Sequence, residues 1–314
     1  MRQLSHLLYF LPGIFFSTAG AQQAMNRIDL FRTGDIRVTV DRPFELKKYR
    51  ETIIVFYALP NGNTTEQTMG RKMKAGDDWH FDIQHIAAQT RFIRGIVKRK
   101  NIIVIYLENQ FLSWPYWKQQ HPDFRERIPV LVDSLQALIP GRKKSICLSG
   151  HSGGGSFIFG YLAGLNAIPS SVTRISFLDS NYGYDSSYYP VLREWLRSNK
   201  THMLNVFAYN DSVALYNGKP VVSSTGGTWY RAHLMLRDLS SEWEFAESGT
   251  DSIRMYKSRN RQVQFFLKPN FNRGIYHTQQ VELNGFVHSL LCGTKYDSRK
   301  YHYYEGRAYA DLIE

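Results

Sequence analysis

The chain has few cysteines and no long apolar run. The first absence argues against a disulfide-rich protein, and the second against one that is anchored in a membrane. Its 314 residues include only 2 cysteines, Cys147 and Cys292, which are too few for a disulfide framework. Neither cysteine has the spacing of a metal ligand, and we expect Cys147 to be a buried free thiol. No segment is long and apolar enough to anchor the mature chain in a bilayer.

Motifs for nucleotides, nucleic acids and metals are missing as well. The sequence contains no phosphate-binding P-loop, no dinucleotide fingerprint and no histidine pairs with ligand spacing. Its formal net charge is +12, but the lysines and arginines are spread along the chain without a nucleic-acid-binding motif. We therefore expect no nucleic-acid partner, no metal and no cofactor.

The first 21 residues have the order of a secretory signal. Arg2 supplies the positive start, residues 7–16 form an apolar run, and small residues up to Ala21 form a cleavage site. The apolar run is too short to span a bilayer as a helix. We expect residues 1–21 to be removed and residues 22–314 to form one domain, secreted or periplasmic, without stable membrane insertion.

Apolar runs of strand length alternate with segments of helical spacing, without a linker or an internal repeat. This alternation predicts an α/β fold, a mostly parallel central sheet with helices on both faces. A hairpin or pair of edge strands should open the fold, formed by 35–41 and the segment after Pro43. The further strands expected are 52–58, 101–106, 146–148, 174–179, 203–209 and 263–267, and the helices are 79–97, 124–138, 157–165, 191–197, 229–239 and one from 289 onward.

The most specific motif lies between two of these segments. Gly150-His151-Ser152-Gly153-Gly154 matches G-x-S-x-G, after the expected strand 146–148 and before the helical segment 157–165. Strand, tight glycine turn and helix are the context of a nucleophile elbow, which exposes its serine at the end of a sheet. Strand and helix nearly collide in such a turn, so the flanking positions need glycine.

By this elbow and the strand order, the chain from about residue 35 resembles the α/β-hydrolase superfamily. The resemblance implies a triad in the order nucleophile, acid, histidine, with Ser152 as the nucleophile. It implies the acid after the second strand beyond the elbow, which favours Asp211, or one strand earlier, which favours Asp179. His288 follows a glycine turn and opens an apolar run, and is the preferred base; His277, nearer the last strand, is the alternative.

Two further features belong to this expected site. The Gly153 N–H follows the nucleophile and should bind the oxyanion, with a second donor from Asn61 or Gly62. An ordinary Asn-Gly turn is the competing interpretation of that loop. The aromatic loops 111–117 and 182–189 follow other strands, where they could line an acyl, aryl or sugar pocket or simply pack.

These features together predict an exported serine hydrolase. Ser152 would attack the carbonyl of a carboxylic ester and form an acyl-enzyme, and the same groups could cleave an amide. No cofactor is needed for this chemistry. The alternative is a catalytically silent hydrolase-like domain that binds a glycan or an acidic surface, which the basic charge and the aromatic loops suggest.

Overall fold

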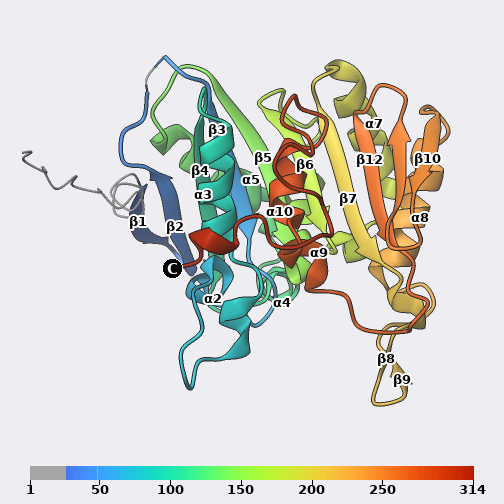
Figure 1. Ribbon diagram of the computed structural model, residues 1–314. Helices are drawn as coiled ribbons and strands as arrows, with labels where there is room; N and C mark the ends of the chain where they lie inside the picture. The colour runs from blue at the N-terminus through green and yellow to red at the C-terminus, as the bar shows by residue number, and fades with distance from the viewer. Residues whose placement is uncertain (1–25, 48) are drawn as a thin grey trace, which may run out of the picture.

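The computed structural model describes residues 26–47 and 49–314, so the predicted signal segment lies outside the described residues. One sheet of ten strands runs through this part of the chain, in the order β1-β2-β4-β3-β5-β6-β7-β12-β11-β10 (Figure 1). Within these ranges, no helix has both the length and the apolarity to cross a membrane.

The sheet centre contains the apolar runs read from the sequence, and every strand predicted from residue 52 onward is present. Strands β3 to β7 and β12 pair in parallel along the order β4-β3-β5-β6-β7-β12. Their side chains are buried on both faces, which explains why they read as continuous apolar runs. The bounds are β2 Ile36–Pro43, β3 Thr52–Ala58, β4 Asn101–Asn109, β5 Lys144–His151, β6 Val172–Leu178, β7 Met203–Tyr209 and β12 Val263–Lys268.

The two edges of the sheet differ from the prediction. Strand β2 forms its hairpin with β1 (Asn26–Thr33), which precedes it, and the segment after Pro43 is not a strand. The reversal occurs at Gly34, whose positive φ of 60° suits glycine. At the other edge, β11 (Arg254–Ser258) pairs antiparallel with β12, and β10 (Phe245–Gly249) pairs antiparallel with β11.

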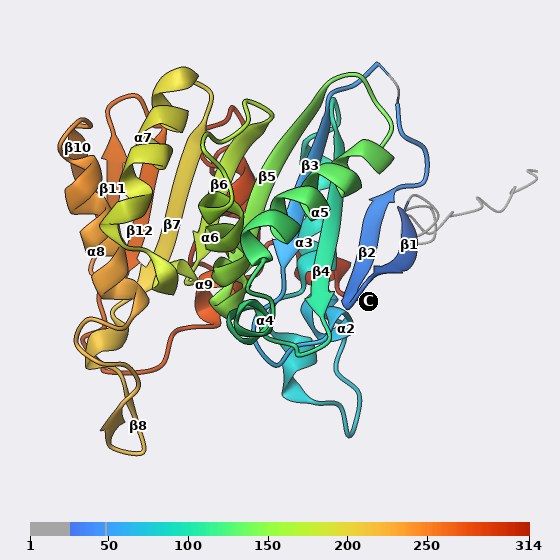
Figure 2. The ribbon, with the colours of Figure 1, turned by 180° about the vertical axis from the view of Figure 1, so that it is seen from behind.

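Helices cover both faces of the sheet, as predicted. Helices α3, α9 and α10 lie on the face seen in Figure 1, and α5, α6, α7 and α8 lie on the face seen in Figure 2. Helix α2 lies near the carboxyl edge, beyond which the small β8–β9 hairpin projects. The bounds are α2 Thr65–Met69, α3 Ile86–Ile96, α4 Trp114–Gln120, α5 Phe124–Leu138, α6 Gly155–Ala163, α7 Tyr189–Ser198, α8 Thr228–Leu239, α9 Gln279–Glu282 and α10 Gly285–Leu291, with β8 Leu215–Tyr216 and β9 Lys219–Pro220.

Three helix predictions need correction. The expected helix 79–97 is a 3₁₀ turn at Trp79–Asp82 followed by α3, because residues 83–85 interrupt the helix. The aromatic loop 111–117 contains the start of α4, capped by the Ser113 hydroxyl, which accepts from the Tyr116 N–H. The last helix begins at Gly285, before the expected position 289.

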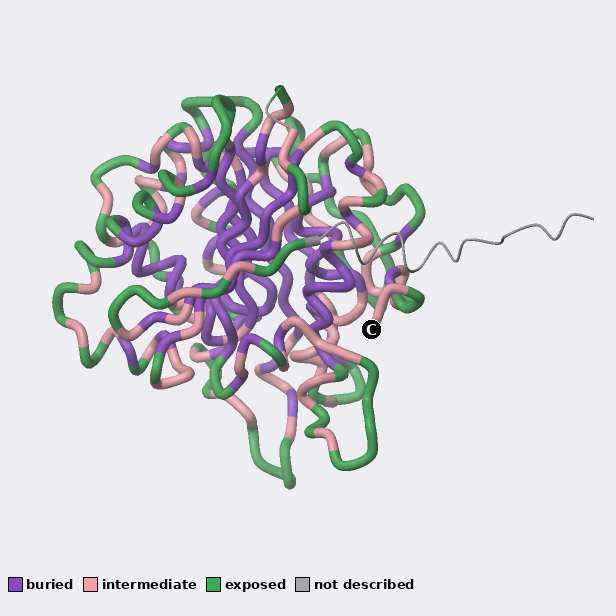
Figure 3. The backbone as a smooth tube through the Cα atoms, turned by 90° about the vertical axis from the view of Figure 1, so that its left-hand side faces the viewer, coloured by how far each residue is buried: buried purple, intermediate pink, exposed green. Residues whose placement is uncertain are grey.

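The core consists of two apolar layers, one on each face of the sheet. Figure 3 shows the buried chain concentrated at the centre, with exposed segments at the periphery. Cys147 and Cys292 belong to the layer beneath α3 and α10, and both are free thiols, as expected for Cys147. Burial raises the pKa of each thiol to about 11, so both are protonated at neutral pH.

Candidate active site

The predicted elbow is present at the carboxyl end of β5. The strand ends at His151, a 3₁₀ turn covers Ser152–Gly154, and α6 begins directly afterwards. Ser152 has a φ of 54°, a left-handed conformation that is strained for a residue with a side chain. The serine is half-buried, whereas His151 and Gly153 on either side are buried. The turn therefore presents one hydroxyl at the sheet edge.

Glycine is required at the elbow because three backbones approach one another there. A Cβ on Gly154 would lie 2.2 Å from the carbonyl oxygen of Ala58, which ends β3. A Cβ on Gly155 would lie 1.7 Å from the carbonyl oxygen of Ser180, which follows β6. Backbone cannot yield as a flexible side chain does, so the glycines let the exits of β3 and β6 pack against the elbow.

The structure pairs a strand-exit carboxylate with a histidine beside the elbow, and the pair is Asp179 with His277. The Nδ1 atom of His277 lies 2.5 Å from Oδ2 of Asp179. Asp179 directly follows β6, has a φ of 47° and is fully buried, while the His277 side chain keeps 23 % of its surface exposed. The His277 ring lies 4.4 Å from the His151 ring, measured between centroids. The sequence analysis allowed both residues, Asp179 as the alternative to Asp211 and His277 as the alternative to His288.

His151 anchors the loop that carries this histidine. Its Nε2 lies 3.2 Å from the backbone carbonyl oxygen of His277, so Nε2 carries the hydrogen and donates it. Burial, followed by the proximity of His277, lowers the pKa of His151 well below its usual value. The neutral His151 ring therefore ties His277 to the residue before Ser152. Sequence reasoning did not assign this role to the variable position of G-x-S-x-G.

Asp211, the acid favoured by the sequence, contacts no histidine in the described structure. It is buried, and its carboxylate accepts from the backbone N–H groups of Thr228 (2.7 Å) and Trp229 (3.3 Å) at the start of α8. Burial and then the nearby Asp179 charge raise the pKa of Asp211 to about 6, although the helix N–H groups oppose this. Asp211 thus acts as a helix cap behind the pair of Asp179 and His277.

The hydroxyl of Thr228 bridges the two carboxylates. Its Oγ1 makes a short hydrogen bond to Oδ1 of Asp179 and lies 3.2 Å from Oδ2 of Asp211. A hydroxyl has a single hydrogen, so it can donate to only one carboxylate at a time. The bridge couples Asp211 to Asp179 and holds Asp179 in place. The sequence analysis did not identify Thr228, because a threonine at the start of a helix is a common cap.

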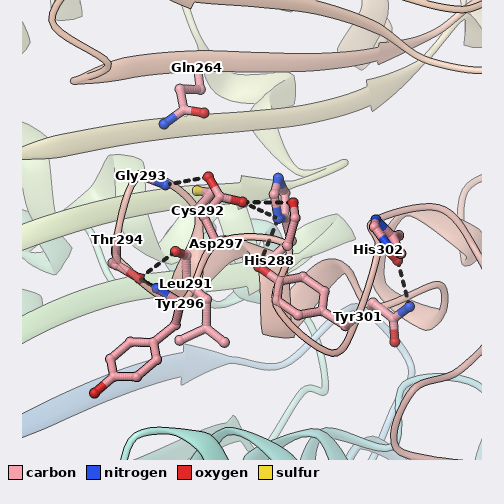
Figure 4. A network of polar contacts seen from close by, with 12 residues as sticks. Gln264, His288, Leu291, Cys292, Gly293, Thr294, Tyr296, Asp297, Tyr301 and His302 are labelled. Atoms are coloured by element: carbon pink, nitrogen blue, oxygen red, sulfur yellow. Dashed lines mark hydrogen bonds and ion pairs between the residues drawn. The ribbon is translucent and has the colours of Figure 1, made fainter.

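The preferred base, His288, lies away from the elbow. It sits inside α10, with its ring 4.6 Å from Phe266 and stacked on Tyr303 at 5.4 Å, measured between centroids. Its Nδ1 lies 3.0 Å from the Tyr301 hydroxyl, and Asp297 is 3.9 Å away (Figure 4). Burial lowers the pKa of His288, which is therefore neutral in the fold. The structure thus does not bring together His288 and Asp211, because α10 packs on the sheet face and not at its edge.

The expected oxyanion donors differ in availability. The side chain of Asn61 lies over Gly153, because a Cβ on Gly153 would come within 1.9 Å of Oδ1 of Asn61. The Asn61 N–H donates to no other residue in the described ranges, whereas the Gly62 N–H donates to the carbonyl of Leu112 at 2.8 Å. Gly62 has the positive φ, 79°, of a tight turn. Asn61 therefore remains a candidate donor with Gly153, and Gly62 does not.

The aromatic loops divide between packing and the site. Trp114, Trp117 and Tyr184 are fully buried and belong to the core. Tyr182 instead lies beside His277, with a distance of 6.4 Å between the ring centroids. In residues 26–47 and 49–314, no group of three or more metal-ligating side chains could hold a metal ion.

Comparison with protein-family models and with curated proteins gives no match. Among solved structures, the chain is similar to a mutant feruloyl esterase module from Clostridium thermocellum complexed with sinapinate, with 12% identity, 89% of this chain and 92% of that chain covered, and a TM-score of 0.45. It is also similar to the siderophore hydrolase EstA from Aspergillus nidulans, with 13% identity and a TM-score of 0.45; the match covers 92% of this chain and 100% of that chain. An S-formylglutathione hydrolase from Agrobacterium tumefaciens is similar with 9% identity and a TM-score of 0.39; the match covers 82% of this chain and 94% of that chain. The mostly parallel sheet with helices on both faces and the elbow at Ser152 agree with the α/β fold that the sequence predicted, and these are the features by which the chain resembles the α/β-hydrolase superfamily.

Proposed function

We propose that this protein is a serine hydrolase that cleaves carboxylic esters through an acyl-enzyme on Ser152. The single observation that carries the proposal is the contact of His277 Nδ1 with the buried Asp179 carboxylate beside a strained elbow serine. A serine hydroxyl is a weak nucleophile and needs an adjacent base, and the base needs a carboxylate to hold its tautomer. Asp179 and His277 supply these two roles in the proposal, in place of Asp211 and His288.

In this proposal, His277 carries the proton. Because Nδ1 of His277 faces Asp179, its Nε2 is left to exchange a proton with substrate and nucleophile. As Ser152 Oγ attacks the ester carbon, Nε2 accepts the hydroxyl proton, and Asp179 stabilises the imidazolium. The carbon–oxygen bond to the leaving alcohol then breaks as Nε2 returns the proton to that oxygen. Water then attacks the carbonyl carbon of the acyl-enzyme while Nε2 accepts its proton. The bond to Ser152 Oγ breaks as Nε2 returns the proton, which releases the carboxylic acid and the free serine.

The oxyanion of the tetrahedral intermediate would lie between two backbone donors. Gly153 follows the nucleophile, and the Asn61 N–H in the loop after β3 has no other partner in the described chain. Donors that are held in place before the reaction stabilise developing charge without reorganising. The contact between Asn61 and Gly153 holds that loop against the elbow.

A serine-reactive fluorophosphonate probe tests the proposal directly. Phosphonylation requires an activated serine and releases fluoride, so the wild-type protein should be labelled and the Ser152→Ala protein should not. Ser156→Ala is the matched control, because Ser156 is half-buried in the first turn of α6. Mass spectrometry of the intact protein measures the labelling. A folded wild-type protein that stays unlabelled would overturn the proposal and favour the silent binding domain.

We further infer that the chain is exported, from the order of charge, apolar run and small residues in 1–21. The mature protein should then begin at Gln22 when it is expressed with its own N-terminus in a secreting host. N-terminal sequencing of the protein outside the cytoplasm measures this. An intact Met1 on all of the recovered protein would contradict export by a cleaved signal.

A further inference from the structure

A cation without an acidic partner lies at the same sheet edge as the elbow. Lys268 ends β12, and its Nζ lies 4.5 Å from the Tyr276 ring and 4.8 Å from the Tyr304 ring, measured to the centroids. No Asp or Glu of the described chain lies within ion-pair distance of this ammonium group. Its partial burial lowers the pKa of Lys268. A partly desolvated ammonium group without a counter-ion gains from binding an anion.

Lys268 opens onto a cavity of about 230 Å³. Besides Lys268 and Tyr276, the cavity is lined by Ser252 and Asn272, whose hydroxyl and amide donate to no other described side chain or backbone group. These two groups and the ammonium are hydrogen-bond donors of the kind that hold a carboxylate. Asp251 is the one acidic residue in the lining, and it makes no ion pair with any described residue.

The strand register relates this cavity to the elbow. His151 lies opposite Leu178 of β6, Leu178 opposite Phe207 of β7, and Phe207 opposite Phe266 of β12. Lys268 is two residues beyond Phe266, so its side chain points to the same face of the sheet as that of Phe266. Along the strand direction, Lys268 lies slightly beyond the level of the elbow. Three strand spacings separate β5 from β12, about 14 Å.

The loop that carries the proposed base connects the two places. Residues 269–278 run from the end of β12 along the carboxyl edge to α9 (Figure 1). Tyr276 lines the cavity and packs edge-on against Tyr209, with their ring centroids 6.3 Å apart. The next residue is His277. The cavity wall and the base are therefore parts of one segment.

We propose that this cavity is a subsite for a carboxylate group that the ester substrate carries at the end remote from its scissile bond. The inference rests on the proposed function, and it identifies the substrate class as half-esters of long dicarboxylic acids. The remote carboxylate would pair with the Lys268 ammonium and accept from Ser252 and Asn272. The scissile carbonyl would lie at Ser152, so only a chain that spans about 14 Å would use both places.

A matched substrate series tests the chain-length requirement. p-Nitrophenyl half-esters of α,ω-dicarboxylic acids are compared with p-nitrophenyl esters of neutral fatty acids of the same length. The ratio of kcat/KM, half-ester over neutral ester, should stay low for short chains and rise by about 10-fold or more once the chain reaches Lys268. A ratio that is independent of chain length would overturn the proposal.

Substitutions of Lys268 and Asp251 should change the kcat/KM ratio in opposite directions. Lys268→Met keeps the apolar stem and removes the charge, so it should lower that ratio for the long half-ester by about 10- to 100-fold, and Lys268→Arg should restore most of it. Asp251→Asn removes the opposing charge from the lining and should raise the ratio by about 2- to 5-fold. A uniform loss on both esters in Lys268→Met would indicate a packing role and would refute the subsite.

A binding measurement separates this inference from the proposed function. Calorimetry with dodecanedioate and the wild-type protein should show binding that Lys268→Met weakens at least about 10-fold, and added salt should weaken it too. This readout does not depend on turnover. If no ester were hydrolysed but dodecanedioate bound through Lys268, the proposed function would fail and the anion site would stand. Equal binding to wild type and Lys268→Met would overturn the site.

Discussion

Replacing His277 with alanine is expected to lower kcat/KM for a p-nitrophenyl ester by at least about 1,000-fold. The reason is that His277 is the histidine whose Nδ1 contacts the buried carboxylate of Asp179, next to the elbow. Without the imidazole, the Ser152 hydroxyl has no group to take its proton. The loss should fall on kcat, since the base acts on the chemical step.

His288→Ala is the matched control, because it removes the same side chain elsewhere in the fold. His288 is buried among aromatic rings in α10, so its truncation leaves a cavity and should lower the free energy of unfolding by about 2–4 kcal/mol. The kcat/KM of the folded fraction should stay within about 3-fold of wild type. Denaturant unfolding and steady-state kinetics measure the two effects. If His288→Ala abolished turnover and His277→Ala did not, the assignment of the base would be wrong.

The pH dependence of stability distinguishes the two histidines further. The pKa of His288 is lowered by burial, so between that lowered value and the ordinary 6.5 the unfolded chain binds a proton that the folded protein does not. The free energy of unfolding should therefore fall as the pH decreases below about 6.5. His151, whose pKa is also lowered by burial, contributes with the same sign. In His288→Ala this slope should be smaller than in wild type.

The parts of the fold that were predictable from the sequence are those encoded locally. The central strands bury both faces, so 52–58 and 203–209 read as unbroken apolar runs, and the observed strands have the same bounds. The elbow was predictable because its glycines lie together in one short motif, at positions where neighbouring backbones leave no room for a Cβ. The edge strands β1 and β10 expose most of their side chains, so they lack an apolar run to mark them.

The pairing within the site depends on long-range geometry. Asp179 and His277 are 98 residues apart in sequence, and their contact depends on the path of the loop 269–278 along the sheet edge. Two strand exits carry an aspartate, and three histidines follow β12, so order along the chain allows several pairings. The apolar run around His288 indicated a helix, correctly, but that helix packs on the sheet face. An apolar context predicts burial and does not by itself predict proximity to a nucleophile.

Asp179→Asn should lower kcat by about 1,000- to 10,000-fold, which is the second large effect. Asparagine is close to isosteric and tolerates the left-handed conformation that Asp179 adopts, with a φ of 47°. It cannot stabilise an imidazolium, and its amide can hold His277 in the wrong tautomer. The variant should therefore fold normally and still lose turnover, which circular dichroism and steady-state kinetics measure.

Asp211→Asn is the matched control, one strand further along the sheet. Asp211 reaches the pair only through the Thr228 hydroxyl and caps α8, so its replacement should reduce kcat/KM by no more than about 10-fold. The groups that face it are Asp179, Thr228 and the tyrosines Tyr182 and Tyr209.

The two aspartates should thus differ in the kind of change that they cause. In Asp211→Asn the change in kcat/KM should depend on pH, whereas in Asp179→Asn the rate should fall at every pH. Because the pKa of Asp211 is raised to about 6, its charge is present above that pH and absent below it, so the kcat/KM of Asp211→Asn should differ from that of the wild type mainly above pH 6. A severe loss in Asp211→Asn with a mild one in Asp179→Asn would mean that Asp211 is the acid, and that His277 turns to it during turnover.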